Sequence, residues 1–385
     1  MDKAELMRDF HRIFGHRPEN PLFLFAPGRI NIIGEHIDYN GGLVMPMAIN
    51  FGTYAMISRR DDGVARFASV NFPEIIEVGL QNIKYDAQHG WANYPKGIIY
   101  HMMADGHTLG GFDILFSGNI PQGAGLSSSA SVEMVMAMAA NAMFGLGYSP
   151  IEMALLAQKS ENQFCGVNCG IMDQFAVGMG KKGHALMLNC DSLEYHLLPL
   201  NLGGHTIVVM DTKKSRQLSE SAYNQRRGEC EEALARLKPI FDVQNLADIA
   251  PENMDKVEEL LGKGVLLMRA RHVISENARV KQGAKLLEKG DVAALGQLLV
   301  ASHKSLALDY EVSCAELDAI VEAALAHPAC IGARMTGAGF GGCAIALVQQ
   351  DNIDNFAKFV SEKYATKIGH LPEIYPVQSG QAEII

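Results

Sequence analysis

The 385-residue sequence lacks the features of a membrane or nucleic-acid-binding protein. It has no apolar run of the roughly 20 residues that a transmembrane helix needs. Residues 1–17 (MDKAELMRDFHRIFGHR) include acidic side chains and no long apolar stretch, so we also expect no signal peptide. The formal net charge is −10 and no run rich in Lys or Arg occurs, which argues against nucleic acid or an anionic membrane as the main partner. These absences predict a cytoplasmic protein that binds small molecules.

Paired cysteine motifs are also absent. Cys165 and Cys169 lie four residues apart, but nothing nearby completes a set of four zinc ligands. The seven cysteines are scattered along the chain: Cys165, Cys169, Cys190, Cys230, Cys314, Cys330 and Cys343. We interpret them as reduced intracellular thiols.

The chain shows no low-complexity linker and no short repeat, and its balance of 48% hydrophobic and 20% charged residues is typical of a globular protein. At this length a single hydrophobic core is not the default, so we expect two domains in one compact body, with a cleft between them as the natural site. Strand patterns dominate the first third and amphipathic helices the second half. This change predicts an α+β fold with two mixed domains, residues 1–200 and 201–385.

The elements are predicted from apolar periodicity and from turn residues. Buried strands are expected at residues 22–26, 67–70, 112–116, 207–210 and 343–348, with strand pairs within 43–60. Helices are expected at residues 127–144, 150–164, 215–237, 265–289, 291–308, 313–326 and 352–364. The first strand runs into Pro27-Gly28, where we expect the chain to turn.

A segment rich in glycine and serine, residues 121–130 (PQGAGLSSSA), lies between a predicted strand and an alanine-rich helix. Its glycines let backbone amides approach a ligand, and the helix start directs unpaired N–H groups and a positive dipole end at it. Phosphate fits such a loop, and the serine hydroxyls suit Mg²⁺ or phosphate oxygens. The segment is not a P-loop, because it lacks the lysine of GxxxxGK[ST]. A serine-capped helix after a flexible turn is the alternative.

A polar segment, residues 29–42 (RINIIGEHIDYNGG), follows the first strand directly. Its ionisable side chains are costly to bury without partners, so we expect them to line a polar site. Glu35, His36 and Asp38 offer acceptors and a donor in close order, which suits a ligand covered in hydroxyl groups. An exposed turn whose charges face water is the alternative.

A third segment, residues 168–175 (NCGIMDQF), places Asp173 among apolar neighbours. This residue is a candidate for a perturbed carboxylate that a nearby Arg29 would keep ionised, or else a helix N-cap. Glu161, on the preceding predicted helix, is a candidate metal ligand or a plain exposed helical residue. Residues 335–343 (MTGAGFGGC) form a second glycine-rich turn, which suits a close approach to phosphate or to the other lobe and does not match the Rossmann fingerprint.

Together the segments PGRINIIGEHIDYNGG, GNIPQGAGLSSSAS, CGIMDQF and TGAGFGGC resemble the motifs of the GHMP kinase superfamily, and within it those of the galactokinase family. The stretches SAYNQRRGECEEAL from Ser221 and SHKSLALDYEVSCAELD from Ser302 are similar to that family too, so the likeness covers most of the chain. The resemblance implies a two-lobed fold, with a ribosomal-S5-like N-terminal domain, a ferredoxin-like C-terminal domain and the active site between them. It also implies phosphorylation of the anomeric hydroxyl of galactose with ATP and Mg²⁺, the first committed step of galactose catabolism.

By motif position the resemblance also assigns roles. Asp173 would be the catalytic acid–base residue and Arg29 its electrostatic partner, while Ser129 and Glu161 would hold Mg²⁺. The triphosphate would lie against Gly123, Ala124, Gly125, Leu126, Ser127, Ser128 and Ser129. The sugar would contact Glu35, His36, Ile37, Asp38 and Tyr223.

Several alternatives stay open at the level of sequence. Ile37 occupies a position that is often Thr in galactokinases, and the form GEHIDY also occurs in kinases that act on N-acetylgalactosamine, whereas Asn40-Gly41-Gly42 and YNQRR favour galactose. A sugar- and ATP-binding regulator without activity, and a relative acting on mevalonate or homoserine, are further candidates. Asp173 is interpreted as a general base, although orienting the hydroxyl alone also suits a loose transition state. We expect a monomer or a weak dimer.

Overall fold

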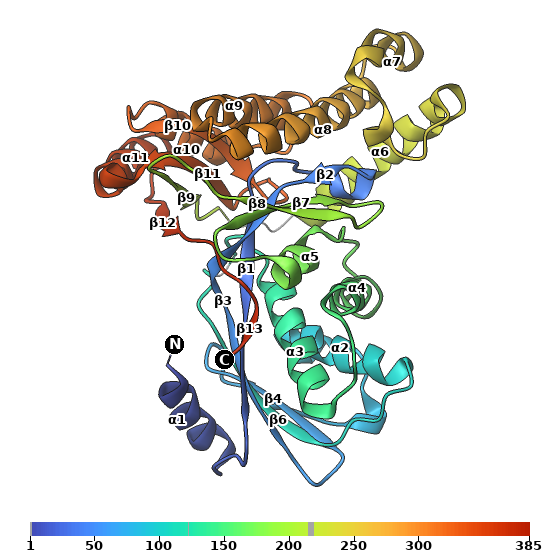
Figure 1. The fold of residues 1–385 in the computed structure, drawn as a ribbon, viewed down its shortest axis with the longest axis vertical. Helices are drawn as coiled ribbons and strands as arrows, with labels where there is room; N and C mark the ends of the chain where they lie inside the picture. Colours follow the sequence, from blue (N-terminus) through green and yellow to red (C-terminus); the bar gives the residue numbers. More distant parts are fainter. Residues whose placement is uncertain (1, 122, 215–218) are drawn as a thin grey trace.

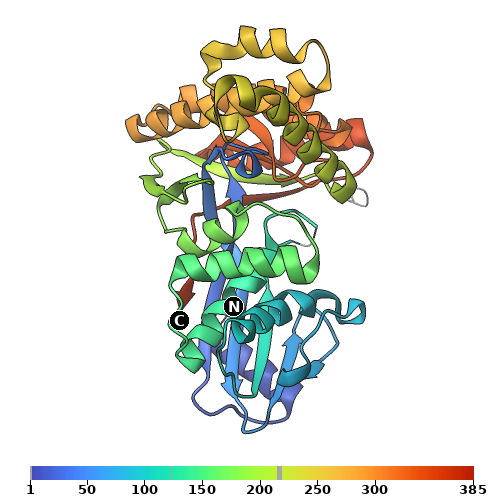
Figure 2. The same ribbon diagram turned by 90° about the vertical axis from the view of Figure 1, so that its right-hand side faces the viewer.

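The protein folds into two lobes stacked along its long axis (Figures 1 and 2). The structure is a computed structural model that describes residues 2–121, 123–214 and 219–385. Gln122 of the predicted phosphate loop and residues 215–218 of a predicted helix lie outside the described residues. Helices and strands are mixed in both lobes, as the sequence predicts.

The first lobe is built on a six-stranded sheet in the order β13-β1-β3-β6-β4-β5. Its strands are β1 Leu22–Asn31, β3 Pro46–Arg59, β4 Val64–Ser69, β5 Ile76–Gly79, β6 Phe112–Gly118 and β13 Glu383–Ile384. All neighbours pair antiparallel except β4 and β6, which run parallel. The predicted strand pairs within 43–60 are instead β2 Leu43–Val44 and the single long strand β3.

The predicted turn at Pro27-Gly28 is wrong, because β1 continues through both residues with only a register shift before Arg29. The glycine serves a close contact here. A Cβ atom on Gly28 would lie 2.5 Å from the carbonyl oxygen of Leu126, which accepts a hydrogen bond from the Arg29 amide at 3.1 Å. Gly28 thus lets the glycine-serine segment lie directly against β1.

Helices cover both faces of the first sheet. On one face, α1 Lys3–Phe14 packs Leu6, Phe10 and Phe14 against the sheet. The other face carries α3 Ser128–Phe144, whose surroundings include α2 Asn93–Ala104, α4 Pro150–Ser160 and α5 Met172–Met179 (Figure 1). The helix predicted over 150–164 ends at Ser160 and continues as a π-helical turn, Glu161–Cys165.

The second lobe has an antiparallel four-stranded sheet in the order β10-β11-β9-β12. The strands are β9 His205–Asp211, β10 Cys330–Thr336, β11 Cys343–Gln349 and β12 Glu373–Val377. The helices of this lobe are α6 Ser219–Phe241, α7 Met254–Leu261, α8 Val265–Lys289, α9 Val292–Leu308, α10 Ala315–Leu325 and α11 Ile353–Ile368. Helices α9, α10 and α11 pack on the sheet, and α6, α7 and α8 pack on one another.

Two segments join the lobes. A small sheet of β2, β7 His184–Asn189 and β8 Tyr195–Pro199 precedes β9, the first strand of the second lobe. After β12 the chain returns to the first lobe, where β13 pairs with β1 (Figure 1). A domain boundary near residue 200 stays a prediction, and the last residues of the chain lie on the first sheet. No helix within the described ranges is long and apolar enough to cross a membrane.

Candidate active site

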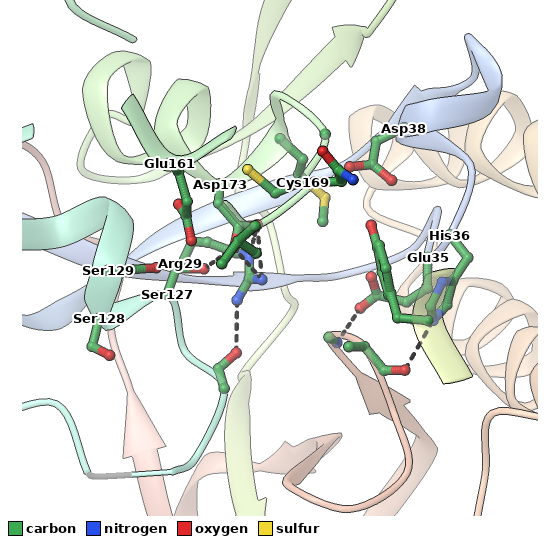
Figure 3. A pocket seen from close by; sticks show the side chains of 18 of the residues that line it. Arg29, Glu35, His36, Asp38, Ser127, Ser128, Ser129, Glu161, Cys169 and Asp173 are labelled. Carbon is green, nitrogen blue, oxygen red and sulfur yellow. Dashed lines mark hydrogen bonds and ion pairs between the residues drawn. The ribbon is translucent and has the colours of Figure 1, made fainter. Parts of the chain in front are cut away.

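A cavity of about 310 Å³ opens between the two lobes (Figure 3). Figure 3 shows Asp173, Arg29, Ser127, Ser129 and Glu161 on one side of it and Glu35, His36 and Asp38 on the other. Its lining comes from residues far apart in the sequence: Arg29, Glu35, His36, Asp38, Gly125, Ser127, Ser128, Ser129, Glu161, Gly166, Val167, Asn168, Cys169, Gly170, Met172, Asp173, Tyr223, Asn224, Gly337 and Ala338. All three sequence segments with predicted chemistry therefore contribute to one cavity.

Asp173 is held at the cavity by an arginine and a serine. It lies in the first turn of α5, whose N-cap position is Ile171, so the alternative of Asp173 as an N-cap does not apply. Arg29 donates from Nε to Oδ1 at 2.8 Å and from Nη2 to Oδ2 at 2.9 Å, and the Ser127 hydroxyl donates to Oδ2 at 2.5 Å. Paired hydrogen bonds between guanidinium and carboxylate are strong and fix direction. The carboxylate keeps 28% of its side chain exposed, so a ligand can reach it.

The glycine-serine loop before α3 also contacts Asp173. Ser127 adopts a left-handed conformation (φ 61°) and caps α3 without a side-chain hydrogen bond, because its hydroxyl is used by Asp173. The first amides of α3 consequently keep no side-chain cap, and this helix end can receive an anion. Arg29 Nη1 also donates to the Gly125 carbonyl at 2.9 Å.

Only part of the predicted phosphate-binding set reaches the cavity. Gly125, Ser127, Ser128 and Ser129 line it. Ala124 and Leu126 are buried in the core, and Gly123 lies outside the lining.

Glu161 lies beside Ser129 and is almost fully buried. The π-helical turn directs it inward, which contradicts the alternative of an exposed helical residue. Burial and the nearby charge of Asp173 raise the pKa of Glu161 to about 7, against hydrogen bonds that lower it and include one from Ser129. Among the described residues no group of three or more His, Cys, Asp and Glu side chains could hold a metal ion. The two oxygen-bearing side chains still match Mg²⁺, which takes few protein ligands and fills its shell with water and phosphate oxygens.

Glu35 ties the polar segment to the second lobe. Its Oε1 accepts from the Thr336 hydroxyl at 2.9 Å and from the Gly337 amide at 2.7 Å. Its Oε2 accepts from Asn31 Nδ2 at 3.0 Å, and Arg334 Nη2 lies 3.3 Å from Oε1. The side chain is 1% exposed, so its predicted sugar contact is restricted to the lone pairs that these donors leave free.

His36 is fixed in the neutral state by its neighbours. Its Nε2 lies 3.0 Å from the Ala338 carbonyl and therefore carries the proton, so Nδ1 accepts from the Tyr39 hydroxyl at 2.7 Å. Burial, together with the nearby His272, lowers the pKa of His36 to about 3. The Tyr223 ring lies 5.5 Å from the imidazole, centroid to centroid.

Asp38 and Ile37 are neighbours in sequence with different surroundings. Asp38 lines the cavity, and its Oδ2 lies against Gly170, where a Cβ atom would approach it to 2.0 Å. Burial raises the pKa of Asp38 to about 7, with further contributions from the charges of Asp173 and Glu35. Ile37 is fully buried, packs against Gly42 and is not part of the lining.

Sequence reasoning missed several lining residues. Cys169 and Gly170 precede Asp173, and a glycine beside a candidate carboxylate was the available signal. Gly337 and Ala338 belong to the glycine-rich turn that the sequence marks for a close approach to the other lobe. Asn224 follows Tyr223 on α6 and carries no comparable signal.

Comparison with known protein families gives three matches along the chain. The model of the galactokinase galactose-binding signature matches residues 8–59, the GHMP kinases N terminal domain matches residues 93–181, and the GHMP kinases C terminal model matches residues 284–366. The chain is 48% identical to the galactokinase of Clostridium tetani over 99% of its own length and 97% of that protein. It is 46% identical to the galactokinase of Bacillus subtilis over 98% of both.

Solved structures agree in fold. The Lactococcus lactis galactokinase complexed with galactose superposes with a TM-score of 0.96 at 41% identity, covering 99% of both chains. The mevalonate kinase of Methanococcus jannaschii gives a TM-score of 0.66 at 19% identity, over 93% of this chain and 98% of that one, and shares the fold alone. The predicted two-lobed architecture is confirmed by these likenesses.

Proposed function

The chain belongs to the galactokinase family of the GHMP kinases, and from this premise we propose how the cavity transfers phosphate from ATP to a sugar. The reaction is the ATP-dependent phosphorylation of galactose to galactose 1-phosphate. N-acetylgalactosamine, left open by the sequence, is not favoured, since the curated relatives above are galactokinases.

Asp173 carries the proposal. Its carboxylate faces the cavity, held by Arg29 and Ser127, at the point where the glycine-serine loop meets the polar segment. Asp173 accepts the proton of the anomeric hydroxyl, which then attacks the γ-phosphate as ADP leaves. Arg29 holds the carboxylate in place and adds positive charge where phosphate charge gathers. Phosphoryl transfer depends on such positioning and charge more than on covalent catalysis.

ATP and Mg²⁺ have their own part of the cavity. Ser127, Ser128 and the uncapped start of α3 receive the phosphates, since amides at a helix start favour anions. Ser129 and Glu161 would hold Mg²⁺, which would supply charge neutralisation to phosphate oxygens. The absence of a P-loop lysine makes this neutralisation necessary.

The sugar lies on the other side. Asp38 and Tyr223 line that side with groups able to bond hydroxyls, and Glu35 adds its remaining lone pairs. Both ring nitrogens of His36 are already bonded, so His36 contacts the sugar by packing of its ring. Ile37 does not reach the sugar directly: it is fully buried against Gly42 and holds the backbone that carries His36 and Asp38.

The protein acts in the cytoplasm as a monomer or weak dimer, with two domains divided near residue 200. Its need for ATP and its scattered cysteines support that compartment. Analytical ultracentrifugation checks the oligomeric state.

The test is Asp173→Asn. We expect kcat to fall by about 10²–10⁴, the usual contribution of a positioned acid or base, with galactose binding by calorimetry within a few-fold of wild type. Asp61→Asn, at an exposed turn, is the matched control and should change neither value. Turnover near that of wild type in Asp173→Asn would remove this residue from the chemistry.

Substrate range is measured by ADP release with galactose, N-acetylgalactosamine, glucose and arabinose. Galactose should be turned over best. No turnover with any of the four sugars would instead support the alternative hypothesis of a non-catalytic regulator.

A further inference from the structure

Two buried polar side chains lie behind the proposed metal ligands. Gln174 and Glu133 are both fully buried. Gln174 Nε2 donates to Glu161 Oε2 at 2.6 Å and to Glu133 Oε2 at 3.3 Å, so one amide bridges two carboxyl groups, which also share a hydrogen bond. Neither residue belongs to the cavity lining, and no step of the phosphate transfer above uses them.

The hydrogen bonding of this bridge is incomplete. Oε1 of Glu133 and Oε1 of Gln174 have no hydrogen-bond partner within the described part of the chain. A buried polar atom without a partner is destabilising, and apolar side chains of similar size would avoid that cost. Stability alone therefore does not account for these two residues.

Their positions in the helices connect them to the chemistry. Glu133 follows Ser129 by four residues on α3, so the two side chains share one face of that helix. Gln174 follows Asp173 in the first turn of α5. One turn of α5 thus bonds Arg29 and Ser127 through Asp173, and Glu161 through Gln174.

We propose that Gln174 is a positioning residue that orients Glu161 for the divalent cation, with Glu133 orienting Gln174 from behind. The inference rests on the proposed function, in which Glu161 is a metal ligand. The amide N–H fixes Glu161 Oε2 and leaves the remaining lone pairs of the carboxylate to the cation. Because Asp173 and Gln174 are adjacent, the spacing between proton acceptor and cation is set by one helical turn, and displacements near 1 Å are costly in such sites.

The experiment measures Mn²⁺ affinity by electron paramagnetic resonance with ADP present, in wild type and in Gln174→Met. Methionine keeps the length of the side chain and removes the donor. We expect Mn²⁺ affinity to fall about 10-fold or more, as for other groups that orient metal ligands, and galactose affinity to stay within twofold. The Mg²⁺ concentration for half-maximal turnover should rise in parallel.

Gln158→Met is the matched control, because Gln158 Nε2 donates a long hydrogen bond, 3.4 Å, to the Cys169 carbonyl and makes no hydrogen bond to Glu161 within the described part of the chain. It should leave Mn²⁺ affinity unchanged. Glu133→Gln is a second variant that keeps side-chain size, and it should lower Mn²⁺ affinity by a few-fold. It decides the question if Gln174→Met does not fold.

Glu161→Gln separates the two levels of the proposal. If Glu161→Gln loses Mn²⁺ affinity while Gln174→Met and Glu133→Gln keep it, the positioning role is wrong and the metal site stands. If Glu161→Gln also keeps full affinity, the assignment of Glu161 as a metal ligand is wrong, and the inference is wrong with it.

Discussion

Asp38 lies near the carboxyl groups of Asp173 and Glu35, and its burial, together with these neighbouring charges, lowers the stability of the protein. Its pKa is about 7 in the folded protein, against an ordinary value of 3.8. Below pH 3.8 the group is protonated in both states and costs nothing. As the pH rises toward 7 the unfolded chain loses the proton first, so the free energy of unfolding falls until the folded pKa is passed.

Asp38→Asn removes this pH-dependent cost. The variant should be more stable than wild type by up to about 4 kcal/mol at pH 8, and the difference should shrink toward pH 5. Urea denaturation at both pH values measures the difference in the free energy of unfolding between the variant and wild type. Other groups with a raised pKa, such as Glu161, are present in both proteins, so their effects on stability cancel in this difference. Asp61→Asn, at an exposed position, should show no such trend, and a pH-independent effect of Asp38→Asn would contradict the raised pKa.

At the scale of elements, the loop before α5 depends on a glycine to admit Asp38. A Cβ atom at position 170 would lie 2.0 Å from Asp38 Oδ2, so Gly170→Ala must push that carboxylate aside. Since Asp38 is assigned to the sugar, the KM for galactose should rise about 10-fold or more, the effect of losing one or two hydrogen bonds, with kcat changed less.

The control for this prediction is Gly228→Ala on α6, where a new Cβ meets nothing within 4 Å. Alanine favours a helix over glycine by about 1 kcal/mol, so this variant should gain stability and keep its KM. An unchanged KM in Gly170→Ala would show that Asp38 does not contact galactose.

Some helices follow from the sequence pattern and others do not. Helices α8 and α9 follow plain periodicity and were predicted within a residue or two. Helix α2 (NYPKGIIYHMMA) was missed because proline and glycine interrupt its first turns. There Gly97 is needed for packing, since a Cβ would lie 2.2 Å from Ser160 Oγ, and one sequence does not reveal that contact.

Some residues of the candidate site are also predictable from the sequence, and others are not. Asp173, Arg29 and the serines stand in local patterns with chemical meaning, and the structure brings them together. Gly170 and Ala338 enter the cavity only through contacts between segments distant in sequence. Local pattern therefore predicts the reacting groups, and tertiary packing decides the shape of the sugar side.

Hydrogen bonds join the two lobes at several places, on more than one side of the molecule. On the cavity side, Glu35 and His36 bond the turn after β10, as described above. On another side, the final segment of the chain crosses from β12 to the first sheet, where the Gly380 amide donates to the Ala48 carbonyl at 2.8 Å and the Asn50 amide to the Gln378 carbonyl at 2.9 Å. One cluster of buried apolar side chains also extends from the first lobe into the second, so apolar packing and these hydrogen bonds together set the relative position of the lobes.

Gly380→Ala tests the second connection. A Cβ atom at this position would lie 2.2 Å from the Ile49 carbonyl oxygen. The atoms nearest to it belong to the backbone of Ile49 and Asn50, so no flexible side chain can move aside. The final segment should detach locally, lowering the free energy of unfolding by about 1–3 kcal/mol. Urea denaturation measures this loss, and hydrogen exchange should quicken at the amides of Asn50 and Gly380. Gly63→Ala, where a Cβ meets nothing within 4 Å, should leave both unchanged. If Gly380→Ala and Gly63→Ala were equally stable, the final segment would not contribute to holding the two lobes together.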